Sequence, residues 1–107
     1  MKPALQGKKL GVLLATTPEH ANFQPVVALL RAAVEEKVSI YLYCIDDGVM
    51  CVGTPEIQKL KQAGVNLFGC AYGAHRRNLA VDETAAWSGL TVVADIIGST
   101  DRFIAFT

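Results

Sequence analysis

The stretch VNLFGCAYGAHRRN, residues 65–78, decides the fold. Its first four residues are a mostly apolar run, typical of a short buried strand, and this run breaks at Gly69. The polar stretch after Cys70 favours a short helix. A strand that leads straight into a helix is the repeating unit of α/β proteins, whose ligands and catalytic groups gather where the strands end. The stretch therefore predicts an α/β fold with Cys70 at the carboxyl edge of the sheet.

On both sides of this stretch, strand-like and helix-like segments alternate without a linker, a repeat or a low-complexity region. The strand-like segments are apolar runs rich in β-branched and aromatic residues, and the helix-like segments repeat apolar residues every three or four positions. This alternation is typical of one α/β domain. We expect strands at residues 9–15, 38–45, 65–68 and 102–106, and helices at residues 22–37, 54–64, 71–77, 82–87 and 91–98.

Capping residues set several of the predicted helix ends. Asn22, Thr54 and Asp82 are of the types that accept hydrogen bonds from the first turn of a helix, and Gly64 is a typical helix terminator. The segment TVVADIIG, residues 91–98, is ambiguous, because its Val and Ile residues favour a strand while their spacing fits one face of a helix. Its end at a glycine and the need for a connection before the last strand favour the helix.

Composition and charge exclude several classes of protein. The chain has 107 residues, of which 51% are hydrophobic, which is enough for one domain spanning residues 1–107. Ten basic residues balance ten acidic ones, so no global field attracts nucleic acid or an anionic membrane. The apolar run at residues 10–15 is too short for a secretion signal, and no segment approaches the length of a membrane span. We therefore expect a soluble cytoplasmic protein.

Three cysteines, at positions 44, 51 and 70, cannot all pair within one chain, and their spacing matches no zinc pattern. This favours a reducing compartment, where each thiol serves packing or chemistry. Cys44 lies inside an apolar strand, and we expect it in the core. Cys51 falls in a loop-like stretch and is a candidate exposed thiol that either resolves a mixed disulfide or has no role.

Position alone leaves two interpretations of Cys70 open. If a helix begins directly after it, the positive end of the helix dipole favours the reactive thiolate form. Arg76 and Arg77 add positive charge, although one of them at i+7 lies ~10 Å away along a helix axis. The alternative is a buried structural thiol. His75 is rotated away from Cys70 on a helix and is expected at the surface.

Other catalytic and binding motifs are weak or absent. The loop ATTPEHANF, residues 15–23, precedes a helix and offers Thr16 and Thr17 to a phosphate group, but it lacks the glycines of nucleotide-binding loops. The sequence has no GxSxG elbow, no HExxH motif and no basic stripe with interleaved aromatics. A nucleotide or small-ligand binder is therefore the least favoured of the hypotheses.

The C-terminal half resembles the DsrE/DsrF-like sulfur-relay family, in particular its TusD-type members. The resemblance rests on CAYGAHRRNLAVDET at residues 70–84, followed by SGL at 88–90 and DRFIAF at 101–106. In the family a cysteine is followed after six and seven positions by two arginines, which here are Arg76 and Arg77. The DGV at residues 47–49 is similar to the turn after the family's second strand.

The resemblance implies a single-domain, three-layer α/β fold with a mostly parallel sheet of four to five strands. It implies a sulfur carrier in which Cys70 holds a persulfide, Arg76 and Arg77 stabilise anionic sulfur or dock an acidic partner, and no metal or organic cofactor takes part. The implied partners are sulfur donor and acceptor proteins. The implied assembly is a trimer or hexamer of this chain, or a hetero-oligomer with homologous chains. Apart from the resemblance, the many apolar residues of so small a domain also predict self-association.

One alternative from another class remains. The chain is then an oligomeric binding or regulatory module of the same fold, in which Cys70 is packed at a subunit interface and performs no chemistry. The reactivity of the Cys70 thiol separates the two hypotheses.

Overall fold

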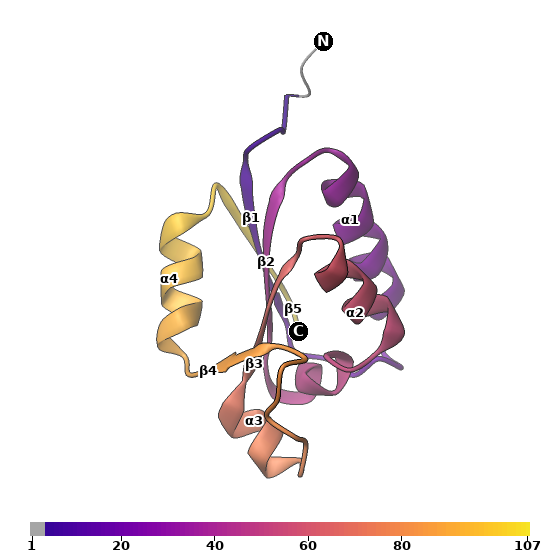
Figure 1. Cartoon of the computed structure of the whole chain (residues 1–107), viewed down its shortest axis with the longest axis vertical. Coiled ribbons are helices and arrows are strands. Elements are labelled where there is room, and N and C mark those ends of the chain that lie inside the picture. The colour runs from indigo at the N-terminus through magenta and orange to yellow at the C-terminus, as the bar shows by residue number, and fades with distance from the viewer. Residues whose placement is uncertain (1–3) are drawn as a thin grey trace.

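The computed structural model describes residues 4–107 and contains one five-stranded sheet (Figure 1). The strand order is β4-β3-β2-β1-β5, and every neighbouring pair is parallel. The strands are β1 (Lys9–Leu14), β2 (Ser39–Cys44), β3 (Asn66–Cys70), β4 (Ala86–Ser88) and β5 (Arg102–Phe106). The helices are α1 (Phe23–Glu35), α2 (Pro55–Gln62), α3 (Ala71–Arg76) and α4 (Thr91–Ser99), with a short 3₁₀ helix η1 at Asp46–Cys51.

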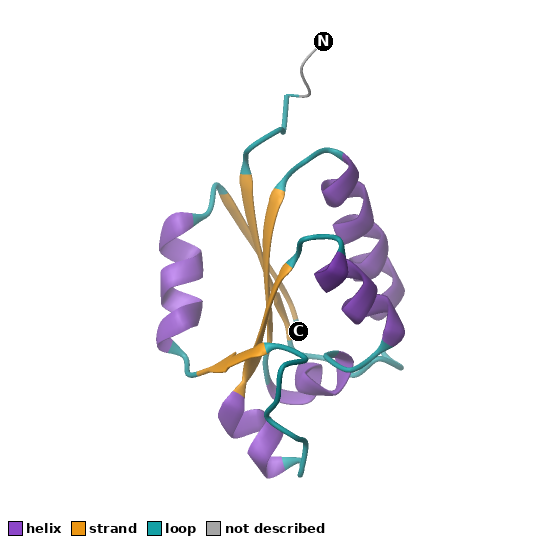
Figure 2. Cartoon of the chain, in the orientation of Figure 1, coloured by secondary structure: helices purple, strands orange, loops and turns teal. Residues whose placement is uncertain are grey.

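The helices form two layers around the sheet. Helices α1 and α2 cover one face, α4 covers the other, and α3 extends beyond the end of β3 (Figure 2). Strands β1 to β4 are laid side by side in chain order, and the chain then returns across the sheet to place β5 beyond β1. Because crossovers between parallel strands are right-handed, this return in the opposite direction puts α4 on the opposite face. The predicted three-layer α/β domain is therefore confirmed.

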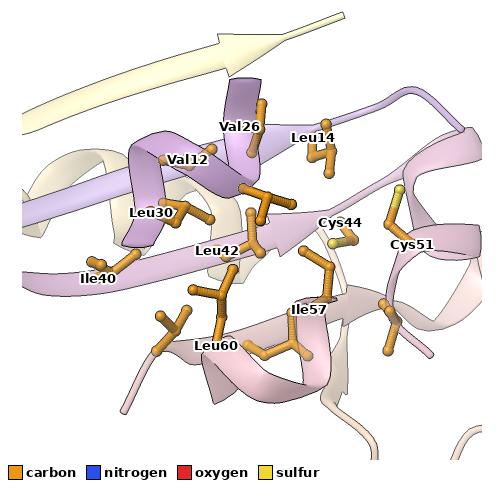
Figure 3. Close-up of a cluster of buried hydrophobic side chains, with 14 of the residues drawn as sticks. Val12, Leu14, Val26, Leu30, Ile40, Leu42, Cys44, Cys51, Ile57 and Leu60 are labelled. Atoms are coloured by element: carbon orange, nitrogen blue, oxygen red, sulfur yellow. The ribbon is translucent and has the colours of Figure 1, made fainter. Parts of the chain in front are cut away.

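The larger hydrophobic core lies between the sheet and the helices α1 and α2 (Figure 3). Alternate residues of β1 and β2 point into it, as the two-residue period of a strand requires. The apolar faces of both helices, with their three- and four-residue spacing, close it from the other side. Its central residues include Val12, Leu14, Val26, Leu30, Ile40, Leu42, Ile57 and Leu60.

A smaller core lies on the face that α4 covers. It contains the buried residues Tyr43, Val49, Cys70 and Ile96. Ile96 is the only buried residue of α4. The close packing of this helix depends on Gly11 of β1, because a Cβ atom there would lie 2.7 Å from the Ile96 side chain. This sheet face is thus covered more thinly than the other.

Most of the predicted elements are confirmed, including the helix at the ambiguous segment 91–98. Thr54 caps α2 as expected, since its hydroxyl accepts a hydrogen bond from the Ile57 N–H. The prediction that Asn22 caps α1 is wrong. The helix begins at Phe23 with no side-chain cap, because the Asn22 side-chain oxygen Oδ1 accepts a hydrogen bond from the Thr16 hydroxyl at 2.6 Å instead.

The predicted helix at residues 82–87 is also wrong, because these residues lead into β4. Asp82 does form a local turn, in which its carboxylate accepts hydrogen bonds from the N–H and the hydroxyl of Thr84. These bonds lower the pKa of Asp82. The chain then pairs with the open edge of β3, and Trp87 packs over Gly69, where a Cβ atom would lie 2.5 Å from its ring. Pairing with a distant strand thus outweighs the local helical signal.

Candidate functional site

Cys70 is both the last residue of β3 and the N-cap of α3. Its sulfur accepts a hydrogen bond from the Gly73 N–H at 3.4 Å. The residue is 7% exposed and packs in the smaller core beside Tyr43 and Val49. The predicted place of Cys70, at the carboxyl edge of the sheet where strand turns into helix, is confirmed.

A pocket of about 360 Å³ opens beside the Cys70 side chain. Three segments meet there: the start of η1, the helix α3 and the turn between β4 and α4. Tyr72 and Leu90 are exposed by 69% and 63%, so the edge of the pocket is apolar and open to solvent. The residues that line it are Ile45, Asp46, Cys70, Tyr72, Gly73, Arg76, Arg77, Gly89 and Leu90. Cys70 and the two arginines that the sequence singled out therefore line one pocket.

The two arginines differ in their partners. The Arg77 guanidinium donates to Asp47 at 2.8 Å, to Asp46 at 3.5 Å and to the Gly73 carbonyl at 3.2 Å. It therefore ties α3 to η1, and two carboxylates compensate its charge. Gly48 lets η1 pack this closely against β1, because a Cβ atom there would overlap the Leu14 carbonyl oxygen.

Arg76 has no carboxylate partner within residues 4–107. Its guanidinium lies 5.9 Å from the centre of the Tyr72 ring, an arrangement that holds the cation over the negative face of the aromatic ring. Arg76 is exposed and lines the pocket. Of the two arginines, it is therefore the one whose charge is available to an anion that enters.

Sequence reasoning missed Tyr43, which lies behind Cys70 and is fully buried. Its hydroxyl lies 3.1 Å from the backbone carbonyl oxygens of both Ser88 and Gly89 and donates to them. Burial raises the pKa of Tyr43, and the nearby Cys70 thiol raises it further. No signal in the run YLYCI marks this tyrosine, because its neighbours come from β3 and β4.

The other two cysteines lie in the larger core (Figure 3). Cys44 is fully buried there, as predicted. The expectation of an exposed Cys51 is wrong, because η1 turns this residue inward and its thiol donates a hydrogen bond to the Thr16 carbonyl at 3.2 Å. Burial raises the pKa of Cys51 to about 12. A resolving thiol needs access to solvent, which Cys51 lacks.

Some of the remaining candidates lie apart from the pocket. His75 is exposed, as expected, and does not line it.

Across residues 4–107, no three His, Cys, Asp or Glu side chains cluster as metal ligands do. In the same part of the chain, no helix combines the length and the apolar character needed to cross a membrane.

The comparisons with known proteins agree with the topology. No protein-family model matches the chain, and no curated protein matches its sequence. Among solved structures, the chain is similar to the ychN protein from E. coli, with a TM-score of 0.75 over 94% of this chain and 100% of the other. The ychN protein has a DsrE-like fold. The fold of this chain is DsrE-like. Sequence identity with the ychN protein is 15%, so the likeness shows the DsrE-like fold and carries no residue roles.

Proposed function

We propose that this chain is an intracellular sulfur carrier that accepts a persulfide sulfur on Cys70 and passes it on. The observation that carries the proposal is the pocket at the carboxyl edge of the sheet. It brings the Cys70 thiol together with Arg76, which has no carboxylate partner among residues 4–107. The sequence likeness of residues 70–84 to sulfur-relay proteins, together with the DsrE-like fold, supports the same reading.

The proposed reaction is a redox-neutral exchange. The Cys70 thiolate attacks the terminal sulfur of a donor persulfide, a bond forms between the Cys70 Sγ and that sulfur, and the S–S bond of the donor breaks. The donor leaves as a thiolate, and Cys70 holds the persulfide. An acceptor thiolate then attacks the outer sulfur of Cys70 and regenerates the Cys70 thiolate. No cofactor enters this balance.

The surrounding residues have distinct roles in this proposal. The Gly73 N–H, which already donates to the Cys70 sulfur, supports negative charge there. Arg76 attracts the anionic persulfide or an acidic surface of a donor or acceptor protein. Arg77 holds α3 in place through Asp46 and Asp47. We expect the protein to work in the cytoplasm, where reducing conditions keep thiols reduced.

The burial of Cys70 favours the second candidate function, a binding or regulatory module without cysteine chemistry. At 7% exposure the thiol resembles a packed core residue, and it belongs to the smaller core together with Tyr43 and Val49. In this case the pocket serves recognition and Cys70 serves packing. The two candidates differ in whether Cys70 reacts.

The deciding experiment loads the protein with sulfur from inorganic polysulfide and measures its intact mass. The wild type is expected to gain the mass of one sulfur atom, and peptide mapping is expected to place it on Cys70. The variant Cys70→Ser should gain none, although it keeps Cys44 and Cys51. Absence of added sulfur on the wild type, or equal loading of Cys70→Ser, would leave the binding module as the better description.

A further inference from the structure

Tyr43 and Cys70 lie on neighbouring parallel strands and point into the same small core. Tyr43 pairs in register with Phe68, two residues before Cys70, and Cys70 pairs with Ser88 on its other side. The Tyr43 hydroxyl reaches the Ser88 and Gly89 carbonyl oxygens, both at 3.1 Å. The fully buried Tyr43 side chain thus extends from β2, and its hydroxyl reaches the turn that borders the Cys70 pocket.

The hydroxyl has more partners than it has protons. A tyrosine hydroxyl carries one proton and donates one strong hydrogen bond at a time. Two carbonyl oxygens at equal distance compete for that proton, and one of them belongs to Ser88, which pairs in register with Cys70. Val49 packs in the same small core as the thiol. The Ser88 hydroxyl is also buried and has no hydrogen-bond partner within residues 4–107. A negative charge on Cys70 would be a stronger hydrogen-bond acceptor than either carbonyl oxygen.

We propose that Tyr43 is a positioning residue for the Cys70 nucleophile, and this rests on the proposed function. When Cys70 is a thiolate, the Tyr43 hydroxyl turns its proton from the Ser88 and Gly89 carbonyl oxygens to the sulfur. When Cys70 is a neutral thiol, the hydroxyl donates to the carbonyl oxygens, as in the structure. The hydroxyl thus stabilises the charge on Cys70 from behind, while the pocket side of the sulfur stays open to the donor persulfide.

The test measures how fast iodoacetamide alkylates Cys70 from about pH 6 to about pH 9 in Tyr43→Phe and in the wild type. A hydrogen bond to a charged group favours the charged form, so Tyr43→Phe should react about tenfold more slowly near neutral pH. The difference should shrink as the pH rises and the thiol ionises without help. The charged groups around the pocket, Asp46, Arg76 and Arg77, are the same in both proteins.

Tyr41→Phe is the matched control. Tyr41 lies on the same strand and packs against the same small core, but no hydrogen bond of its hydroxyl occurs within residues 4–107. Its alkylation profile should match that of the wild type. If Tyr43→Phe gives the wild-type profile, or is slowed by the same factor at every pH, the inference is overturned.

Two further readouts keep the inference separate from folding and from the proposed function. In Cys70→Ala, NMR of the Tyr43 ring should show a pKa of Tyr43 below its wild-type value, because the Cys70 sulfur that raises it is gone. An unchanged Tyr43 pKa would overturn the inference that the two side chains interact, even if Tyr43→Phe does not fold. If the wild type takes up no sulfur but Tyr43→Phe is still alkylated more slowly near neutral pH, the sulfur-carrier function is overturned. The role of Tyr43 is then intact.

Discussion

At the residue scale, three thiols of one chain meet different surroundings. Cys44 and Cys51 are fully buried in the larger core, where desolvation by burial raises the pKa of both thiols. Cys70 lies instead at the junction of β3 and α3 and lines a pocket. The thiolate is the nucleophilic form of cysteine, and a thiol sealed in an apolar core is inert. Position in the fold, rather than residue type, therefore separates the candidate nucleophile from the structural thiols.

The first prediction concerns selective alkylation. Iodoacetamide at neutral pH should modify Cys70 in the folded protein and leave Cys44 and Cys51 unmodified, because the pKa of Cys51 is about 12 and that of Cys44 is raised as well. Mass spectrometry of the digested protein locates the modified cysteine. In denaturant all three should react, which controls for peptide detection. Modification of Cys51 before Cys70 in the native state would contradict the buried position of Cys51.

At the element scale, α4 depends on a small residue beneath it. Gly11 of β1 leaves room for the Ile96 and Phe103 side chains, both of which would lie 2.7 Å from an added Cβ atom. Because Ile96 is the only buried residue of α4, few other contacts can compensate for a displaced helix. The turn before α4 borders the Cys70 pocket through Gly89 and Leu90. The packing of α4 on the sheet thus bears on the shape of the site.

The second prediction compares two glycine substitutions. Gly11→Ala should lower the free energy of unfolding by about 1–3 kcal/mol, the usual cost of overpacking a close contact. Gly98→Ala is the matched control, because an added Cβ atom there meets no atom within 4 Å and alanine favours a helix. It should leave stability unchanged or raise it by up to about 1 kcal/mol. Urea unfolding measures both, and equal destabilisation by the two variants would refute the close packing of α4 over Gly11.

At the scale of the whole molecule, the thin coverage of one sheet face leaves apolar side chains in solvent. Leu90 and Ile97, at the start and inside α4, are each more than half exposed, as is Tyr72 of α3 beyond the end of the sheet. Leu13, Tyr41 and Phe68 on the α4 side of the sheet are only partly buried. Exposed apolar surface of this kind marks interaction sites in small domains. It supports the proposal that the chain assembles with copies of itself or with homologous chains.

The third prediction follows from this surface. Size-exclusion chromatography with light scattering should give a mass above that of the 11.5 kDa chain at micromolar concentration, and we expect a trimer or a hexamer. Because apolar contacts are insensitive to ionic screening, the assembly should persist in high salt. A monomer at every concentration tested would refute self-association and leave hetero-oligomers with homologous chains as the proposal to test.

The sequence by itself determined the alternation of strands and helices, the core position of Cys44 and the place of Cys70. Hydrophobic period, capping residues and glycine positions are local signals, and a parallel α/β domain consists largely of such local units. For the same reason the ambiguous segment 91–98 was predicted correctly as a helix. The sequence also singled out Arg76 and Arg77, although it did not reveal that their partners differ.

Only the tertiary structure decided which distant residues meet. Three contacts join segments far apart in the chain. Arg77 pairs with Asp46 and Asp47, the Cys51 thiol turns inward to the Thr16 carbonyl, and the Tyr43 hydroxyl bonds to Ser88, the register partner of Cys70. The segment expected as a helix at residues 82–87 leads into β4 instead. It pairs with the open edge of β3, and Trp87 fills the space over Gly69. Local propensity amounts to fractions of a kcal/mol per residue, and the burial and strand pairing that override it exist only once the sheet has formed.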